Sequence, residues 1–276
     1  DIITYNSLLD GYCLRGQIDE ASNLMDMMVR KGVQLDVVSF NTMINGYCKC
    51  KYLDQAFNLF REMTFRGVKP DVVTYNTLID GLCKDGRLHQ VLPLFDEMQA
   101  QGLCPDVVTC GSLLDGLCKN GQLNVAVAIF SELERKGLIS YIVLYNILIG
   151  AMCEEGRLKD AANIFSRLLS KGLQPNCKTY TTMIKGLCKK GKLTQASQLL
   201  AKMEGHRCCP NEVTYNILIR GFLCNNEVTQ ALQLIEVMTG KGFSPDADTT
   251  SLLLELLSNE QIEKSAREWL QNKVKH

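Results

Sequence analysis

A repeat of 35 residues covers nearly the whole chain and limits it to one kind of architecture. The segment VVTYNTLIDGLCKDGRLHQVLPLFDEMQAQGLCPD, residues 72–106, recurs along the sequence with substitutions and without insertions. Successive units begin at Ile2, Val37, Val72, Val107, Ile142, Cys177, Glu212 and Ala247. A fixed period in this range is typical of a solenoid, in which each unit contacts only its neighbours.

Each unit is expected to form two amphipathic helices. Apolar residues recur at the spacing of one helix face, first at Tyr75, Leu78, Ile79, Leu82 and Cys83, and again at Leu88, Val91, Leu92, Phe95 and Met98. Gly86 separates the two stripes, Thr74 is the expected N-cap, and Pro93 is expected to disturb the second helix. Neither stripe can be buried by one hairpin alone, so the pattern predicts an all-α stack of helix-turn-helix units.

The repeat also predicts the domain organisation, which is a single elongated array. Seven full units span 2–36, 37–71, 72–106, 107–141, 142–176, 177–211 and 212–246. Residues 247–276 read as a degenerate eighth unit with a C-terminal capping helix that carries Ile262, Ala266, Trp269 and Leu270. Asp1 matches the residue that closes other units, so we expect the chain to be part of a longer array with its targeting segment upstream.

Charge and cysteine content restrict the function classes. The chain has 30 Lys and Arg against 30 Asp and Glu, so a polyanion would have to be held by a local groove and not by bulk charge. No apolar run approaches the roughly 18 residues that a membrane span needs. Six of the 13 cysteines recur every 35 residues on the buried stripe, where free Cys acts as a small apolar residue. These are Cys13, Cys48, Cys83, Cys118, Cys153 and Cys188.

The remaining cysteines show no paired C-x-x-C spacing, and the chain has only three histidines. We therefore expect no metal site and no cofactor, and a reducing intracellular compartment. Nothing places a nucleophile beside a histidine, so the chain is not expected to be an enzyme or to take a small-molecule substrate.

Two positions of the unit vary within a narrow chemical range and are not needed for packing. The fifth residue is Asn6, Asn41, Asn76, Gly111, Asn146, Thr181 and Asn216 in turn. The last residue is Asp36, Asp71, Asp106, Tyr141, Asn176, Asn211 and Asp246. These positions are expected to lie close in space, where amides, hydroxyls and carboxylates could read hydrogen-bonding edges in sequence. The alternative is local, because Asn also caps helix starts well.

The unit resembles that of the pentatricopeptide repeat (PPR) proteins of the P subclass. The motifs that carry the resemblance are VVTYNTLIDGLCKDG, VTYNILIRGF and the closing KPD or CPD. It implies a right-handed superhelical solenoid that binds single-stranded RNA with one base per unit. The style of the units is similar to that of restorer-of-fertility-like members, which implies RNA processing in plant mitochondria, with the plastid as second choice.

In this family the fifth and last residues form the base-reading pair. The resemblance then implies uracil for units one, two, three and seven, cytosine or uracil for unit five and adenine for unit six. Gly111 with Tyr141 implies no base, which gives UUUN(C/U)AU from 5′ to 3′. The second residue of each unit would clamp bases between units, and these are Ile3, Val38, Val73, Val108, Val143, Lys178 and Val213. Lys178 adds a charge to this otherwise apolar row.

Lysines that end the first helix are expected to contact phosphates, by the same resemblance. They are Lys49, Lys84, Lys119 and Lys189. The alternative is that lysine at a helix C-terminus stabilises the helix dipole. Two other functions stay open from the sequence: a protein-binding solenoid, and an array that guides separate RNA-processing proteins.

Overall fold

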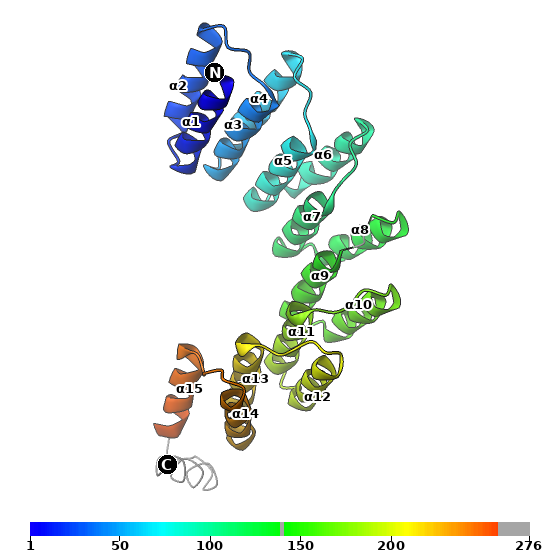
Figure 1. The fold of residues 1–276 in the computed structure, drawn as a ribbon. Coiled ribbons are helices and arrows are strands. Elements are labelled where there is room, and N and C mark those ends of the chain that lie inside the picture. The colour runs from blue at the N-terminus through cyan, green and yellow to red at the C-terminus, as the bar shows by residue number, and fades with distance from the viewer. Residues whose placement is uncertain (139–140, 259–276) are drawn as a thin grey trace. The chain divides into compact units, whose positions relative to one another are not determined.

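The computed structural model describes residues 1–138 and 141–258, and this part of the chain consists of fifteen α-helices (Figure 1). They are α1 Ile2–Leu14, α2 Ile18–Arg30, α3 Val37–Lys49, α4 Leu53–Phe65, α5 Val72–Asp85, α6 Leu88–Ala100, α7 Val107–Lys119, α8 Leu123–Arg135, α9 Ile142–Glu154, α10 Leu158–Ser170, α11 Cys177–Lys189, α12 Leu193–Gly205, α13 Glu212–Cys224, α14 Val228–Gly240 and α15 Ala247–Ser258. The odd-numbered helices start at the residues where the repeat units begin. The expected closing helix with Trp269 lies outside the described residues.

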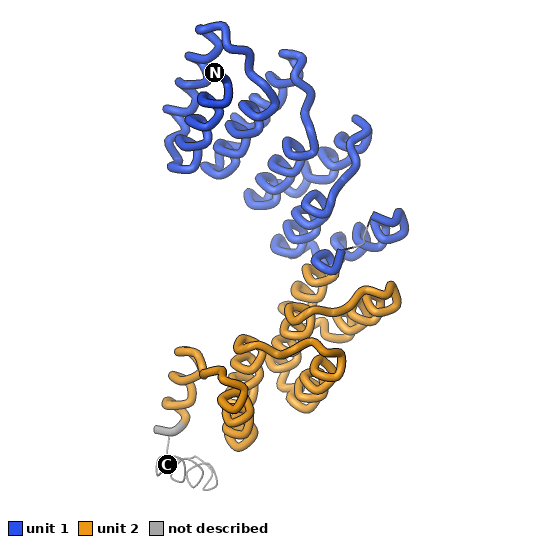
Figure 2. Tube along the Cα trace, viewed as in Figure 1, with its two compact units in different colours: residues 1–144 blue, residues 145–276 orange. Residues whose placement is uncertain are grey.

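The chain divides into two compact units, residues 1–144 and residues 145–276, where the repeat had suggested one array (Figure 2). The division falls inside α9. In the first compact unit, α1, α3, α5 and α7 pack in chain order, and each also packs on the helix that follows it. In the second, α11 packs on α13 and α13 on α15 in the same way. Within each compact unit, the odd-numbered helices therefore form one layer and the even-numbered helices another.

The fourth residue of each repeat lies at the centre of the core. Phe40, Tyr75, Tyr145, Tyr180 and Tyr215 are all completely or almost completely buried. The apolar stripes expected from the sequence surround them. The neighbouring fifth residue is half-buried at Asn6, Asn41 and Asn76 and buried at Asn146 and Asn216.

Aspartate begins the first helix of a repeat, which corrects the expectation that Thr74 is the N-cap. Asp71 is the N-cap of α5, and its Oδ1 accepts hydrogen bonds from the backbone N–H of Thr74 at 2.9 Å and from its hydroxyl at 3.0 Å. The Thr74 hydroxyl in turn accepts the N–H of Asp71 at 3.1 Å. The expectation was wrong because Asp and Thr both act as N-caps, and the sequence does not show which of the two precedes the first helical residue. The same reciprocal pair starts α3, α7 and α11.

The turns of the hairpins use left-handed backbone, which normally requires glycine. Gly86 has φ 77° between α5 and α6. Lys51 and Asn226 take positive φ values of 64° and 60° at hairpin turns, and Arg207 has φ 57° after α12, where other repeats have their closing glycine. The fold thus tolerates non-glycine residues at these turns, with the strain that a side chain brings there. The second helix of unit three runs through Pro93 from Leu88 to Ala100.

Adjacent first helices approach closely because cysteine faces glycine. A Cβ atom added at Gly46 would lie 2.6 Å from Cys13 Sγ, and one at Gly81 would lie 2.8 Å from Cys48 Sγ. Gly186 and Gly221 face the cysteines of their preceding units in the same way. The cysteines are free thiols, as expected from their place on the buried stripe.

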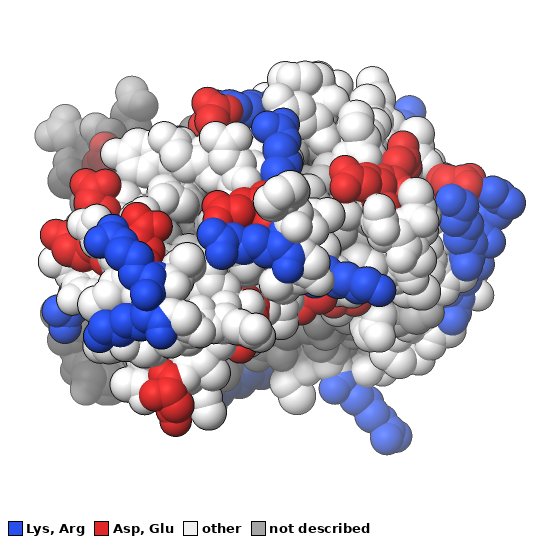
Figure 3. Space-filling model, turned by 90° about the horizontal axis from the view of Figure 1, so that it is seen from above, with Lys and Arg blue, Asp and Glu red and all other residues white. Residues whose placement is uncertain are grey.

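Charged side chains of both signs are interspersed on the face drawn in Figure 3. This mixture agrees with the equal numbers of acidic and basic residues in the sequence. Of the fifteen helices in the described ranges, none is both long and apolar enough to cross a membrane.

Candidate nucleic-acid interface

The structure brings the fifth and last residues of the first three repeats into direct contact. The amide Nδ2 of Asn6 donates to Asp36 Oδ1 at 3.1 Å, and Asn41 donates to Asp71 in the same way at 3.1 Å. Asn76 donates to Asp106 Oδ1 at 3.2 Å. Each pair joins a residue of one first helix to the N-cap of the next. Asparagine therefore does not cap its own helix here, and the capping alternative applies to the aspartate.

A hydroxyl of the next repeat fixes the asparagine in the first two pairs. Ser39 Oγ donates to Asn6 Oδ1 at 2.7 Å, and Thr74 Oγ1 donates to Asn41 Oδ1 at 2.6 Å. The amide orientation is thereby set, with its NH₂ toward the aspartate. In the third pair, Oδ1 of Asn76 is buried and has no hydrogen-bond partner among the described residues.

The aspartates of these pairs have pKa values below the ordinary value of an aspartate. Partial burial alone would raise the pKa of Asp36, but hydrogen bonds from Ser39 and from the Asn6 amide outweigh it and lower the pKa. The pKa of Asp71 is lowered by equivalent bonds from Thr74 and Asn41, again against the effect of burial. All these side-chain bonds reach Oδ1, so Oδ2 presents a negatively charged acceptor that no side chain occupies.

A hollow of about 490 Å³ opens over the third pair. Its wall includes both members of the pair, two clamp residues and two of the lysines: Asn76, Asp106, Val73, Val108, Lys49 and Lys84. The residues expected to read the base, to clamp it and to contact phosphates therefore line the same hollow. A second hollow of about 310 Å³ shares Asp80, Lys84 and Ser112 with the first and extends to Lys119.

The clamp positions are apolar residues that remain exposed. Val73 and Val108 are 56 % and 55 % exposed, although both are in the first turn of a helix that buries its other apolar side chains. The same holds for Ile3, Val38, Val143 and Val213. Lys178, the exception in chemistry, is also exposed. Packing does not explain a row of exposed valines, whereas contact with a flat apolar ligand would.

Three of the four expected phosphate-binding lysines have carboxylate partners. Lys84 pairs with Asp80, and Lys119 pairs with Asp115, each at 2.6 Å across one helical turn. Lys189 pairs with Glu154 of the preceding repeat at 2.8 Å. Among the described residues, no carboxylate pairs with Lys49. The pairs are exposed, so exchange of the carboxylate for a phosphate would cost little.

Glu154 connects two repeats within the second compact unit. Hydrogen bonds from Lys185 and Lys189 lower the pKa of its carboxyl to about 2. The sequence pattern did not predict this contact of Glu154. The contact could not be read from spacing along one helix, because the partners lie on successive first helices.

The fourth, fifth and sixth pairs differ from the first three. Gly111 offers no side chain, and Tyr141 is 53 % exposed. Asn146 is buried with its Oδ1 unpaired in the described structure, while Asn176 caps α11. In unit six, Thr181 and Asn211 are connected through a third residue, Thr214. The Thr181 and Thr214 hydroxyls lie 2.8 Å apart, and Thr214 donates to Asn211 Oδ1 at 2.9 Å.

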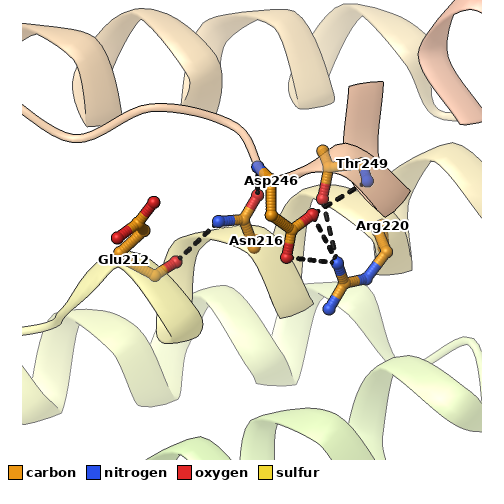
Figure 4. Close-up of polar contacts among 5 residues, drawn as sticks. All are labelled: Glu212, Asn216, Arg220, Asp246 and Thr249. Carbon is orange, nitrogen blue, oxygen red and sulfur yellow. Dashed lines mark hydrogen bonds and ion pairs between the residues drawn. The ribbon is translucent and has the colours of Figure 1, made fainter. Parts of the chain in front are cut away.

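The seventh pair is arranged around an arginine (Figure 4). Arg220 Nη1 lies 2.7 Å from both carboxylate oxygens of Asp246 and 3.1 Å from Thr249 Oγ1. Asn216 is 1 % exposed, donates to the Glu212 carbonyl at 3.1 Å, and accepts the Asp246 N–H at 3.0 Å. A hydrogen bond from Thr249, opposed by partial burial and aided by Arg220, lowers the pKa of Asp246 to about 2. Sequence reasoning did not single out Arg220.

The rest of the described chain contains a further hollow but no group of metal-binding side chains. In residues 1–138 and 141–258, no three His, Cys, Asp or Glu side chains are grouped as a metal ion would require. A larger hollow of about 760 Å³ lies between α10 and α12. Its wall includes Phe165, Leu169 and Leu199 and contains none of the reading residues.

Comparison with known proteins identifies the family. The PPR repeat family matches residues 1–43, 35–84, 70–119, 105–139, 141–189, 179–224 and 210–259, so the chain belongs to the PPR family. No curated protein matches the chain.

Solved structures of PPR proteins are similar to this chain. The crystal structure of PPR10 from maize matches at 26 % identity with a TM-score of 0.71, over 96 % of this chain and 41 % of that protein. PPR10 in complex with an 18-nt psaJ RNA element matches at 25 % identity with a TM-score of 0.57, over 94 % of this chain and 46 % of that one. The chain thus spans less than half the length of these structures.

The PPR domain of protein-only RNase P 1 from Arabidopsis thaliana, in complex with tRNA, shares the fold. It is 20 % identical with a TM-score of 0.50, over 63 % of this chain and 91 % of that domain.

Proposed function

We propose that this chain binds single-stranded RNA sequence-specifically and reads one base with each repeat. The observation that carries the proposal is the third repeat. There a hydrogen-bonded Asn76–Asp106 pair lies in the wall of a hollow between two exposed valines, with lysines at its edge. The RNA complex of the similar maize protein PPR10 supports the same kind of ligand for this chain.

The chemistry of the first three pairs suits uracil. An amide NH₂ group and a carboxylate oxygen lie side by side, so one donates and the other accepts. Uracil presents an acceptor, O4, beside a donor, the N3–H, on its Watson–Crick edge. Cytosine presents the reverse order and would place its N3 lone pair against a carboxylate. The exposed valines would contact the faces of the base, which every base offers.

The site follows from applying the pairs in chain order, which gives 5′-UUUN(C/U)AU-3′. Fluorescence anisotropy on RNAs that contain UUUUCAU tests it against RNAs in which the three leading uracils become guanines. The exchange is expected to weaken binding by at least tenfold, since each mismatched base costs about 1–3 kcal/mol in specific nucleic-acid complexes. Equal binding of the two RNAs would contradict base reading.

A variant of one repeat provides the matched control. Asn76→Thr with Asp106→Asn reproduces the Thr181 and Asn211 combination of unit six, and Asn211 shows that asparagine keeps the N-cap. The variant is expected to prefer adenine at the third base while its preference at the first two bases is unchanged. A uniform loss at all three bases would indicate damage to the fold and not a changed reading pair.

Lysine contacts predict the salt dependence. If Lys49, Lys84, Lys119 and Lys189 each neutralise one phosphate, log affinity is expected to fall with log salt at a slope of about −3, from about −0.7 per contact on single strands. Lys49→Gln should reduce the slope by about one contact, because no described carboxylate holds this lysine. A slope near zero would contradict phosphate binding.

The role that we propose in the cell rests on the resemblance of the repeat units alone. We place the chain in organellar RNA processing, in mitochondria, as a site-occupying member similar to the fertility restorers of the P subclass. The support is the style of the repeat units. Crosslinking and sequencing of RNA bound to the protein in its native tissue tests this, and recovery of nuclear transcripts alone would contradict it.

A protein ligand is the second candidate, and the hollow between α10 and α12 is the observation that favours it. Binding to this face would leave the Asn and Asp pairs free. Binding of a partner that is unchanged by Asn76→Thr and lost with Phe165→Asp would support this function, whereas loss of base preference would not.

A further inference from the structure

The ninth residue of each repeat lies one turn after the reading residue, on the same face of the first helix. Its identity changes along the chain: Asp10, Asn45, Asp80, Asp115, Gly150, Lys185 and Arg220. In the third repeat, Asp80 pairs with Lys84 on its own helix, and Asp106 accepts a hydrogen bond from Asn76. In the seventh, Arg220 reaches the closing aspartate itself.

Arg220 replaces the contact that defines the first three pairs. In those pairs the Asn amide donates to Asp Oδ1, and no side chain donates to Oδ2. In unit seven, Nη1 lies 2.7 Å from both oxygens of Asp246, and the Asn216 amide instead donates to the Glu212 carbonyl. The orientation of the Asn216 amide is fixed, because the Asp246 N–H can only donate and the Glu212 carbonyl can only accept.

The donor and acceptor pattern thereby differs from that of the first three pairs. Asn216 is buried, and both carboxylate oxygens of Asp246 accept from a guanidinium whose side chain is 30 % exposed. All three contacts of Arg220 use Nη1, while Nη2 points away from Asp246 (Figure 4). Unit seven therefore adds guanidinium N–H donors beside the closing carboxylate, where units one to three have only the asparagine amide.

We propose that Arg220 is the specificity-determining residue of the seventh repeat and that it removes the preference for uracil over cytosine there. The inference rests on the proposed function. Cytosine carries two adjacent acceptors, N3 and O2, which match the parallel N–H groups of a guanidinium. Uracil would place its N3–H against the same donors. Asn and Asp at the fifth and last positions are thus insufficient to specify uracil when arginine is the ninth residue.

The test compares the third and seventh bases in one protein by fluorescence anisotropy. With UUUUCAU as the parent RNA, U→C at the third base is expected to weaken binding about fivefold or more. U→C at the seventh base is expected to leave binding within twofold or to strengthen it. Arg220→Asp, which copies the ninth residue of unit three, should restore a preference for uracil of about fivefold at the seventh base. The ratio of the two affinities is the readout, because the lost positive charge weakens both RNAs alike.

Asp80→Arg supplies the reciprocal variant and keeps the test valid if Arg220→Asp fails to fold. It should abolish the uracil preference at the third base while leaving the first two bases unchanged. If the wild type distinguishes U from C at the third base and equally at the seventh, the role of Arg220 is wrong and the proposed function stands. The role of Arg220 is also wrong if neither variant changes the ratio of the affinities for RNAs with U and with C at its base. Indifference of the wild type at the third base would contradict pair reading itself, and with it this inference.

Discussion

In each of the first three closing aspartates, Oδ1 accepts hydrogen bonds both from the helix that it caps and from the asparagine of the preceding first helix. Asp71 Oδ1 accepts the N–H of Thr74 and so starts α5, and the same atom accepts the amide of Asn41. The residue expected to read a base is therefore also a helix cap. Its burial is only partial, and no side chain donates to Oδ2.

Substitution of Asp71 should separate the two tasks. Asp71→Ala removes the cap and should lower the free energy of unfolding by about 1–2 kcal/mol, together with the base preference at the second position. Asp71→Asn keeps a capping oxygen, as Asn211 does for α13, so stability should be nearly retained while the preference for uracil falls. Urea unfolding followed by circular dichroism, combined with anisotropy, measures both. Equal destabilisation by the two substitutions would show that the cap depends on charge alone.

Neighbouring first helices are held at short range by the cysteine-to-glycine contact. The contact recurs from repeat to repeat, because a larger residue at either position would separate the helices. It gives the buried thiol a packing role in these units.

Gly81→Ala should destabilise the first compact unit by about 1–3 kcal/mol, the usual cost of overpacking. The new Cβ would lie 2.8 Å from Cys48 Sγ and 3.0 Å from Leu53 Cδ2. Cys48→Ala removes the nearer atom, so the double variant should be less destabilised than the sum of the single variants. Additive losses in a double-mutant cycle would mean that the two residues do not touch.

The hairpin turns carry strain that glycine would relieve. Lys51 has φ 64° where the equivalent Gly86 of the next repeat has φ 77°. Lys51→Gly is expected to stabilise the protein by about 1 kcal/mol, the order of the cost of left-handed backbone for other residues. The matched variant Gly86→Lys should lower stability by a similar amount. Thermal unfolding of both variants checks the sign.

The buried thiols make the stability of the molecule depend on alkaline pH. Burial raises the pKa to about 11 for Cys13, Cys83 and Cys153 and to about 12 for Cys48 and Cys188. The unfolded chain loses these protons near its ordinary value of 9.0, so deprotonation favours unfolding. The contribution of these protonated thiols to the free energy of unfolding is fully present below pH 9, and it declines as the pH rises toward about 12.

Urea midpoints at pH 8 and pH 10 should therefore differ, with the lower value at pH 10. Cys188→Ala should reduce the difference, since it removes one of the most strongly raised thiols. An unchanged pH dependence in this variant would assign the effect to other groups, such as lysines in ion pairs.

Much of the whole molecule could be predicted from its sequence because one pattern is repeated many times. The 35-residue period predicted where the first helix of each unit begins. The apolar stripes predicted the core residues, among which Tyr75 and Leu78 are buried. The pairing of Asn76 with Asp106 followed from their place in the unit, although spacing did not show that Asp106 caps a helix. The contacts of Glu154 and Arg220 could not be predicted, because each depends on how one first helix lies against the next.

The cap formed by the closing residue also limits which codes such an array can adopt. A residue that begins the next helix does so best with a short side-chain oxygen, which favours Asp, Asn, Ser or Thr at this position. Six of the seven closing residues belong to this set, namely Asp36, Asp71, Asp106, Asn176, Asn211 and Asp246, whereas Tyr141 does not, although α9 still begins at Ile142. New base preferences would then arise more readily at neighbouring positions that carry no structural duty. If the chain reads RNA as proposed, the bases that it can distinguish depend on how its helices begin as well as on the RNA.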